Sequence, residues 1–246
     1  MKRVKLEVAY DGTNYYGWQR QNGRITVEEV LTRVLGELLK EEVVLTGASR
    51  TDSGVHACGN VAVFDTNVRM PAEKISYALN TRLPDDIRIQ SSCEVPLTFH
   101  PRYDAHRKLY RYRILNCTFP LPTERLYSHF MYYPLDVERM QEAASCLVGR
   151  HDFKSYCSVN TSARDTVRQI YRIDVNRNEN IVEIEVEGNG FLYNMVRIIV
   201  GTLIKIGTGE WEKERAQAAL EARNRLAAGP TAPAKGLSLV KIYYEE

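Results

Sequence analysis

The sequence predicts an α+β fold made of two similar halves, with mainly antiparallel sheet and a central cleft between the halves. Three observations lead to this prediction. Some segments alternate apolar and polar residues, as strands with one buried face do, and others repeat apolar residues at helical spacing. The two kinds of segment follow the order β-α-β-β-α-β in each half. We assign residues 1–104 to the N-terminal half and 105–246 to the C-terminal half.

The N-terminal half begins with a predicted strand over residues 4–10 that ends at the Asp11-Gly12 turn. A helix starts at Thr26, because Thr26 and Glu29 have the spacing of a capping box and apolar residues recur at helical spacing up to residue 39. Strands are predicted over 43–45 and 61–64. A second helix begins with Pro71 at its first position, and a strand follows around Ile87. A long strand over 108–115 comes next, after the boundary at residue 104.

The C-terminal half contains a predicted helix from Val137 that stops at Gly149, then strands over 167–175 and 181–186. Residues 191–206 are apolar on nearly all sides, which indicates a buried helix. This stretch is shorter than the ~20 residues that a membrane span needs, and it contains Arg197 and Lys205. An amphipathic helix over 212–225 and a strand over 237–243 complete the half.

Composition excludes several classes of protein. An apolar fraction of 44% excludes a disordered chain, and 33 Lys plus Arg against 31 Asp plus Glu give no bulk sign of a nucleic-acid partner. The 5 cysteines contain no C-x-x-C pair, which argues against a zinc knuckle or a disulfide framework. Charges interrupt the first residues, where a signal peptide would be apolar. We therefore expect a soluble, cytoplasmic protein that spans no membrane and holds no metal.

The most informative motif is residues 49–57, Ser-Arg-Thr-Asp-Ser-Gly-Val-His-Ala. Its composition favours a turn, and the simplest interpretation is a surface turn in which Asp52 bonds its own backbone. Arg50 lies two residues before Asp52, and in an extended strand both side chains point to the same face. A cation placed there keeps the carboxylate ionised, and an ionised carboxylate can serve as nucleophile or base.

A second candidate is Arg197, a charged residue within the apolar run 191–200. A charge in a buried helix needs a partner, and losing that partner costs roughly 3–5 kcal/mol. Arg197 therefore belongs to a structural ion pair, reaches solvent with its tip, or meets Asp52 across the cleft.

The third candidate is the strand over residues 107–113. Between residues 102 and 113 there are five Arg or Lys against one Asp, a local charge of +4. Alternation divides the strand into one face with Lys108, Tyr110 and Tyr112, and another with Arg107, Leu109, Arg111 and Arg113. Aromatic rings between cations suit single-stranded RNA, while the alternative is an edge strand protected by charge from aggregation.

Together these residues resemble the TruA family of tRNA pseudouridine synthases. Residues 49–57 are similar to the family signature G-R-T-D-x-G-V-H-A, with Ser49 in place of its first glycine. Further matches follow in family order along the chain, at residues 10–19, 83–87, 99–102, 108–112, 149–153, 191–198 and 228–233.

The resemblance implies the pseudouridine synthase fold and an isomerase (an intramolecular transferase) that converts uridine to pseudouridine at positions 38, 39 and 40 of the tRNA anticodon stem-loop. It implies that Asp52 is the catalytic aspartate, which we predict to be the nucleophile, with Arg50 and Arg197 beside it. It also implies that Tyr110 stacks on the target base and that the enzyme is a homodimer without cofactor or metal. We further expect tRNA contacts from Arg20, Arg24, Arg107 and Lys108.

The chemistry leaves two routes open. The N-glycosidic bond must break, the uracil must turn, and C5 must bond to C1′, after the base has been flipped onto an aromatic ring. Asp52 opens the reaction either by attack on the nucleoside or by taking a proton from the ribose. Tyr110 is a candidate for the base that removes the C5 proton. The alternatives to this function are a tRNA-binding or tRNA-folding protein without turnover, and a paralogue with a shifted target position.

Other motifs support other enzyme classes less well. Residues 9–13 resemble the end of an aspartyl-phosphatase motif, but Ala9 stands where the nucleophilic aspartate would be. His151 and Asp152 lack the second ligand cluster of a metal-dependent hydrolase. We interpret these two residues as core or capping residues, and His56 as a residue that orients the turn after Asp52.

Overall fold

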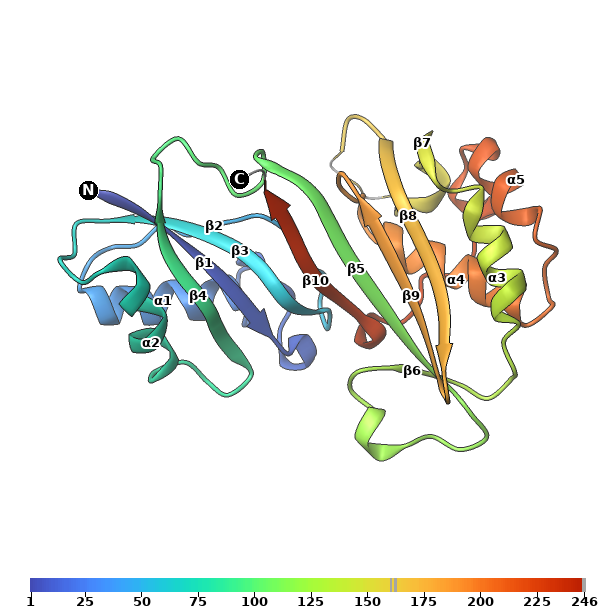
Figure 1. Ribbon diagram of the computed structural model, residues 1–246, viewed down its shortest axis with the longest axis horizontal. Coiled ribbons are helices and arrows are strands. Elements are labelled where there is room, and N and C mark those ends of the chain that lie inside the picture. The colour runs from blue at the N-terminus through green and yellow to red at the C-terminus, as the bar shows by residue number, and fades with distance from the viewer. Residues whose placement is uncertain (160, 162, 245–246) are drawn as a thin grey trace. The chain divides into compact units, whose positions relative to one another are not determined.

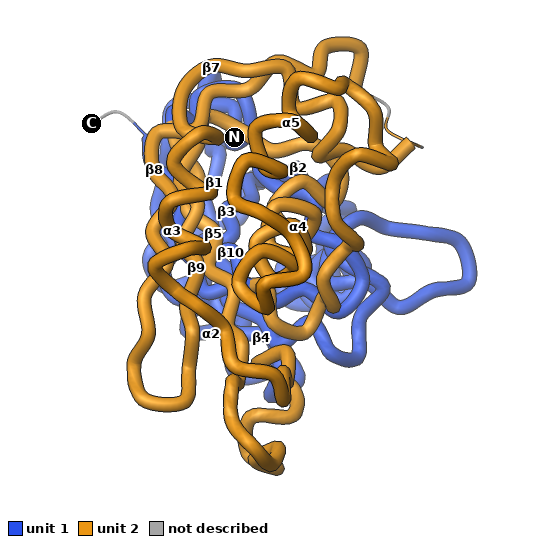
Figure 2. Tube along the Cα trace, turned by 90° about the vertical axis from the view of Figure 1, so that its right-hand side faces the viewer, with its two compact units in different colours: residues 1–106, 238–246 blue, residues 107–237 orange. Residues whose placement is uncertain are grey.

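A computed structural model describes residues 1–159, 161 and 163–244. The chain forms two compact units, coloured separately in Figure 2: unit 1 comprises residues 1–106 and 238–246, and unit 2 comprises residues 107–237. Each unit combines helices with strands that pair mostly antiparallel to their neighbours (Figure 1). The predicted α+β class is confirmed.

Unit 1 is built on four neighbouring strands in the order β4-β1-β3-β10, and a short β2 also pairs with β3. The elements in chain order are β1 (Lys2–Tyr10), η1 (Gly12–Asn14), α1 (Val27–Leu39), β2 (Thr46–Gly47), β3 (His56–Thr66), α2 (Ala72–Asn80), β4 (Ile87–Val95) and β10 (Leu237–Tyr244). Up to β4 this is the predicted β-α-β-β-α-β order.

The elements of unit 1 form for the reasons that the pattern predicts. Along β1 every second residue is buried, and these residues are apolar up to the closing Tyr10. Thr26 caps α1, because its side chain accepts a hydrogen bond from the Glu29 nitrogen at 3.3 Å. Two details differ. Residues 43–45 form no strand, and Pro71 precedes α2 as its N-cap instead of forming its first turn.

Unit 2 has the strand order β5-β9-β8-β7, and β6 runs parallel to β5. Its helices α3 and α4 pack against each other, and α3 covers β8 (Figure 1). The elements are β5 (Ala105–Asn116), η2 (Pro122–Glu124), β6 (His129–Met131), α3 (Val137–Ser145), β7 (Gly149–Asp152), η3 (Lys154–Tyr156), β8 (Val167–Asn178), β9 (Ile181–Gly188), α4 (Met195–Gly207), α5 (Arg215–Ala222), η4 (Arg225–Ala227) and η5 (Ala234–Gly236).

The apolar helix of unit 2 is α4, and it begins four residues later than the pattern from residue 191 predicts. Asn194, at its N-cap, adopts a left-handed backbone with φ of 59°, which separates residues 191–193 from the helix. Most of α4 is buried. Within the described residues, no helix is both long and apolar enough to cross a membrane.

The compact units differ from the predicted halves in one respect. The boundary after residue 106 lies close to the predicted boundary at 104, but residues 238–246 belong to unit 1. The reason is a long-range strand pairing, since Ser238 and Leu239 of β10 pair in parallel with His56 and Ala57 of β3. The end of the chain therefore joins unit 1 next to the motif that contains Asp52.

Candidate active site

Asp52 lies in the loop between β2 and β3 and is half-buried. Its carbonyl oxygen accepts a hydrogen bond from the Val55 nitrogen at 3.1 Å, which closes a tight turn over residues 52–55. Thr51, before Asp52, and Val55 are both buried. Asp52 therefore lies at the start of a short turn that is anchored on both sides.

The segment over residues 15–18 holds this turn by backbone hydrogen bonds. The Trp18 nitrogen donates to the Thr51 carbonyl at 3.1 Å, and the Gly54 nitrogen donates to the Tyr15 carbonyl at 3.3 Å. Gly17 is required at this contact: it has a φ of +81°, and a Cβ there would lie 2.4 Å from the Thr51 oxygen. This contact explains why the motif at residues 10–19 accompanies the motif at 49–57.

A third motif supports the same turn through Asp86, just before β4. The Tyr15 hydroxyl donates to Asp86 Oδ1 at 2.5 Å, and the Asp11 nitrogen donates to the Asp86 carbonyl at 2.9 Å. His56 is buried, and its Nδ1 lies 3.0 Å from the Gly12 nitrogen and 3.1 Å from Asp11 Oδ1. These contacts agree with the interpretation of His56 as a residue that orients the loop.

Arg50 does not lie in an extended strand, contrary to the prediction from the sequence. Residues 48–55 form a loop, so the argument from an extended strand does not apply to residues 50 and 52. The Arg50 side chain is exposed, and within the described residues it makes no hydrogen bond or ion pair. Its cation is therefore open to solvent.

In unit 2, Arg197 lies on the first turn of α4 and is half-buried. Its Nε donates to the Ala232 carbonyl at 2.7 Å, and its Nη1 donates to Asn194 Oδ1 at 2.8 Å. The Ala232 nitrogen in turn donates to the Arg197 carbonyl at 3.1 Å. The motifs at 191–198 and 228–233 thus meet at this guanidinium, which they hold in a defined direction.

Tyr110 and Tyr112 point to the same face of β5, as predicted, and both are buried. The Tyr110 ring meets the Phe191 ring edge-on, with 5.1 Å between the ring centres. The Tyr112 hydroxyl donates to the Pro233 carbonyl at 2.8 Å, and burial raises the pKa of this phenol well above its usual value. Tyr112 is therefore a neutral core residue, and Tyr110 lies next to residue 191 at the start of the Arg197 motif.

The row of cations on β5 is largely neutralised by its neighbouring strand. Arg107 pairs with Glu187 at 2.9 Å, Arg111 with Glu185 at 2.8 Å, and Arg113 with Glu183 at 3.3 Å. The local charge of +4 seen in the sequence is therefore not a free positive surface. Arg107 stays a predicted tRNA contact, but it already has a carboxylate partner.

The remaining predicted tRNA contacts lie apart from Asp52 in the sequence. Arg20 and Arg24 are exposed in the loop before α1, and the Arg24 guanidinium lies 4.3 Å from the centre of the Tyr16 ring. Lys108 is half-buried on β5. The stacked pair of Arg24 and Tyr16 offers a cation and an aromatic face to solvent.

The sequence matches the tRNA pseudouridine synthase family over residues 7–104 and 143–245. The chain is 49% identical over 244 residues to tRNA pseudouridine synthase A of Thermoanaerobacter sp. (strain X514), covering 99% of this chain and 100% of that one. It is 44% identical over 245 residues to the protein of the same name from Bacillus pumilus (strain SAFR-032), covering 99% of each. The chain belongs to the tRNA pseudouridine synthase family.

The predicted resemblance is thereby confirmed. Tyr110 lies outside the two ranges that match the family, but the full-length relatives align with 99% of the chain. Among solved structures, a chain of a Cbf5-Nop10-Gar1 complex aligns at 13% identity and a TM-score of 0.39, covering 98% of this chain and 50% of that one. A likeness at this score adds nothing to the family assignment.

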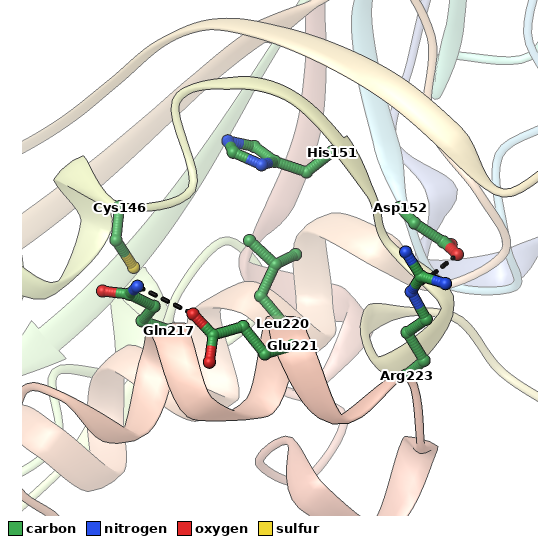
Figure 3. A pocket seen from close by; sticks show the side chains of 7 residues that line it. All are labelled: Cys146, His151, Asp152, Gln217, Leu220, Glu221 and Arg223. Carbon is green, nitrogen blue, oxygen red and sulfur yellow. Dashed lines mark hydrogen bonds and ion pairs between the residues drawn. The ribbon is translucent and has the colours of Figure 1, made fainter.

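A hollow of about 560 Å³ in unit 2 is lined by seven residues, of which only His151 and Asp152 belong to the motifs (Figure 3). Its polar side chains bond to one another or to backbone: Gln217 donates to Glu221 at 2.8 Å, and Arg223 lies 3.4 Å from Asp152. Burial raises the pKa of the Cys146 thiol in this hollow, so the thiol stays protonated. No group of three or more metal-ligating side chains occurs in the described part of the chain.

The sequence alone did not identify the residues that hold Asp52 and Arg197 in place. Gly17 and Asp86 support the turn of Asp52, and Asn194 and Ala232 orient Arg197. All four belong to motifs that were recognised only as matches. One feature of the sequence could have indicated most of them: three of their four motifs match the family but contain no residue with a predicted catalytic role.

Proposed function

We propose that this member of the family isomerises uridine to pseudouridine at positions 38, 39 and 40 of the tRNA anticodon stem-loop. The observation that carries the proposal is the position of Asp52 in a tight turn of unit 1, which residues 15–18 hold directly and Asp86 supports through Tyr15. The identity of 49% to a full-length tRNA pseudouridine synthase A supports it. We further propose that the protein acts as a homodimer in the cytoplasm.

Asp52 opens the reaction, by attack on the nucleoside or by removal of a ribose proton. The bond from N1 to C1′ breaks, the uracil turns, and a new bond joins C5 to C1′. The proton on C5 then leaves to a base, for which Tyr110 is our candidate, and N1 gains a proton. Because no atom is added in total, the reaction needs no redox partner, and we expect it to proceed without cofactor or metal.

We propose roles for three further residues, which the family resemblance implies. Tyr110 stacks on the flipped base, a role that suits an aromatic ring already braced by Phe191. Arg197 and Arg50 supply positive charge that keeps Asp52 ionised and stabilises negative charge as the glycosidic bond breaks. The held guanidinium of Arg197 favours this role, because oriented charges need little reorganisation during reaction.

The phosphate backbone of tRNA would meet the exposed cations. Arg20, Arg24, Arg107 and Lys108 are our proposed contacts. Among them, Arg24 presents its guanidinium together with the Tyr16 ring, a combination that suits unpaired nucleotides of a loop. Arg107 would contact phosphate only by sharing its charge with Glu187.

The test uses tRNA that carries tritium at C5 of its uridines, since formation of the new bond at C5 releases this hydrogen to water. Wild-type protein should release tritium, and Asp52→Ala should release none. Asp85→Ala is the matched control: Asp85 is exposed, pairs with Arg88 at 2.7 Å, and should leave release unchanged.

Two outcomes would contradict the proposal. Release that survives Asp52→Ala would remove Asp52 from its role. No release by wild-type protein on any tRNA, together with retained tRNA binding, would favour the alternative of a tRNA-binding protein without turnover.

A further inference from the structure

We propose that a buried cluster of Tyr10, Thr51 and Asn60 positions the carboxylate of Asp52, and that its hydrogen bonds are needed for the rate of reaction more than for tRNA binding. The inference rests on the proposed function, because it assigns a positioning role around Asp52. The three residues lie in unit 1: Tyr10 at the end of β1, Thr51 just before the turn, and Asn60 on β3.

The centre of the cluster is a hydrogen bond between two hydroxyl groups. Tyr10 Oη and Thr51 Oγ1 are 2.7 Å apart, and the two residues are only 4% and 7% exposed. Thr51 directly precedes Asp52. Because Trp18 also binds the Thr51 carbonyl at 3.1 Å, Thr51 is fixed through both its side chain and its backbone.

Asn60 supports the other end of the loop. Its side chain is fully buried, and its Nδ2 donates to the Ser49 carbonyl at 3.1 Å and lies 3.5 Å from Tyr10 Oη. Its Oδ1 accepts a hydrogen bond from the Val61 nitrogen at 3.0 Å. The side chain is therefore bonded at both ends, and it links β3 to the loop and to Tyr10.

Polar side chains in a core need hydrogen-bond partners, whereas apolar side chains of the same size do not. The strand face that ends at Tyr10 is otherwise formed by Val4, Leu6 and Val8, and a hydroxyl buried there destabilises the fold unless it finds a hydrogen-bond partner. The hydrogen bonds of the cluster have a direction that apolar packing lacks. They fix the residue before Asp52, and displacement of a reacting group by about 1 Å can cost on the order of 100-fold in rate.

The test is a double-mutant cycle with Tyr10→Phe and Thr51→Val, each of which removes one hydroxyl and keeps most of the shape. We expect each variant to lower the single-turnover rate of tritium release about 10-fold or more, with the Kd for tRNA within about two-fold of wild type. The double variant should be no slower than the slower single variant, because both remove the same hydrogen bond. Thr51→Ser keeps the hydroxyl and should restore most of the rate.

Tyr244→Phe is the matched control in the same unit. It also removes a phenol hydroxyl, which donates to the Pro101 carbonyl at 2.7 Å, but this bond does not reach the turn. Its rate should match wild type. Hydrogen exchange provides a readout without activity: amides of residues 51–55 should exchange faster in Tyr10→Phe and not in Tyr244→Phe.

Several outcomes would overturn the inference. These are a Tyr10→Phe rate equal to wild type, rate losses that multiply in the double variant, or a loss confined to tRNA affinity. If wild-type protein releases no tritium, the proposed function itself fails, and the exchange rates of residues 51–55 then decide separately whether the cluster holds the turn.

Discussion

Arg197 is a charged side chain on a buried helix, and two oxygen acceptors of the same unit hold its guanidinium. One of these acceptors is the Ala232 carbonyl, and the other is the Asn194 side chain. The sequence indicates that a charge in this apolar run needs partners, but a backbone carbonyl 35 residues away leaves no mark in a sequence pattern. The need could be predicted, and the identity of these partners could not.

Arg197→Ala should therefore affect both stability and rate. The two acceptors lose their donor, and we expect the free energy of unfolding to fall by about 1–3 kcal/mol. The single-turnover rate should fall by about 100-fold or more, if the guanidinium stabilises developing charge. Urea unfolding and tritium release measure the two effects.

Lys205→Ala is the control on the same helix. Lys205 lies near the end of α4 and pairs with Glu210 at 2.5 Å, so its loss should change unfolding by no more than about 0.5 kcal/mol and leave the rate unchanged. An Arg197→Ala protein with full stability and full activity would contradict the role given to its hydrogen bonds.

The partners of other single residues also could not be identified from the sequence pattern. The sequence predicted the alternation of β5, and the structure agrees with it at Tyr110 and Tyr112. The local charge of +4 does not form a free positive surface, because Glu183, Glu185 and Glu187 of β9 pair with the arginines of β5. Each glutamate lies 70 or more residues from its arginine in the sequence, so only the register of β5 and β9 reveals the pairing.

At the scale of elements, the packing of α4 against residues 228–233 orients Arg197, and it depends on two glycines. A Cβ on Gly201 would lie 1.8 Å from the Pro230 oxygen, and a Cβ on Gly229 would lie 2.6 Å from the Thr202 nitrogen. The Gly229 nitrogen also donates to Thr202 Oγ1 at 2.9 Å. The sequence predicted α4 as an apolar helix, but it could not show which of its faces needs this close approach.

Two of the helix glycines, Gly201 and Gly36, should respond oppositely to substitution by alanine. Gly201→Ala forces the backbone of α4 away from Pro230 and should destabilise the protein by about 3 kcal/mol or more. Gly36→Ala in α1 meets no atom closer than 3.4 Å, and the better helix propensity of alanine should stabilise by about 0.5–1 kcal/mol. Thermal and urea unfolding measure the change in the free energy of unfolding for each variant. A change of the same sign in both variants would contradict the role given to the close packing at Gly201.

The pairing of β1 with β3 carries a charge contact that should make stability depend on pH. Arg3 and Asp65 are opposite each other in the register, and two hydrogen bonds of 2.7 and 2.8 Å join them. The hydrogen bonds from Arg3 hold the pKa of the Asp65 carboxyl below its usual value. A carboxyl with a lowered pKa in the folded state stabilises the protein above its unfolded pKa of about 3.9, and this contribution disappears as the pH falls through the folded pKa.

Asp65→Asn should accordingly lower the free energy of unfolding at pH 7 by up to about 1 kcal/mol, since the pair is partly exposed. The difference from wild type should shrink below about pH 4. Asp85→Asn is the control, because Asp85 is fully exposed and exposed ion pairs such as its pair with Arg88 contribute little to stability. Urea unfolding at several pH values tests this, and a difference that is constant from pH 7 to pH 3 would contradict it.

The whole chain forms two compact units, and the first boundary between them, after residue 106, lies near the predicted boundary at 104. The exception is β10, which returns to pair with β3. Strand alternation predicted β10 as an element, but a pattern within one strand does not identify the strand with which it pairs. The net charge of +2 likewise says little about binding, because the paired charges of β5 and β9 cancel while Arg24 and Arg50 lie exposed.

We expect tRNA binding to weaken as salt concentration rises, because phosphate contacts release counterions. Arg24→Ala should reduce the slope of log Kd against log salt by about 1, if Arg24 contacts one phosphate. Arg111→Ala is the control, since Arg111 is paired with Glu185 and should leave the slope unchanged. Filter binding at several salt concentrations measures these slopes, and a flat response of wild type would contradict a phosphate-contacting surface.

In the proposed function, Asp52 starts the conversion of uridine to pseudouridine at positions 38, 39 and 40. The most direct measurement is to incubate an unmodified tRNA transcript with the protein and to map pseudouridine along it at single-nucleotide resolution. Wild type should produce pseudouridine at those positions that hold uridine, and Asp52→Ala should produce none. Pseudouridine formed by Asp52→Ala, or formed by wild type only outside the anticodon stem-loop, would contradict the account.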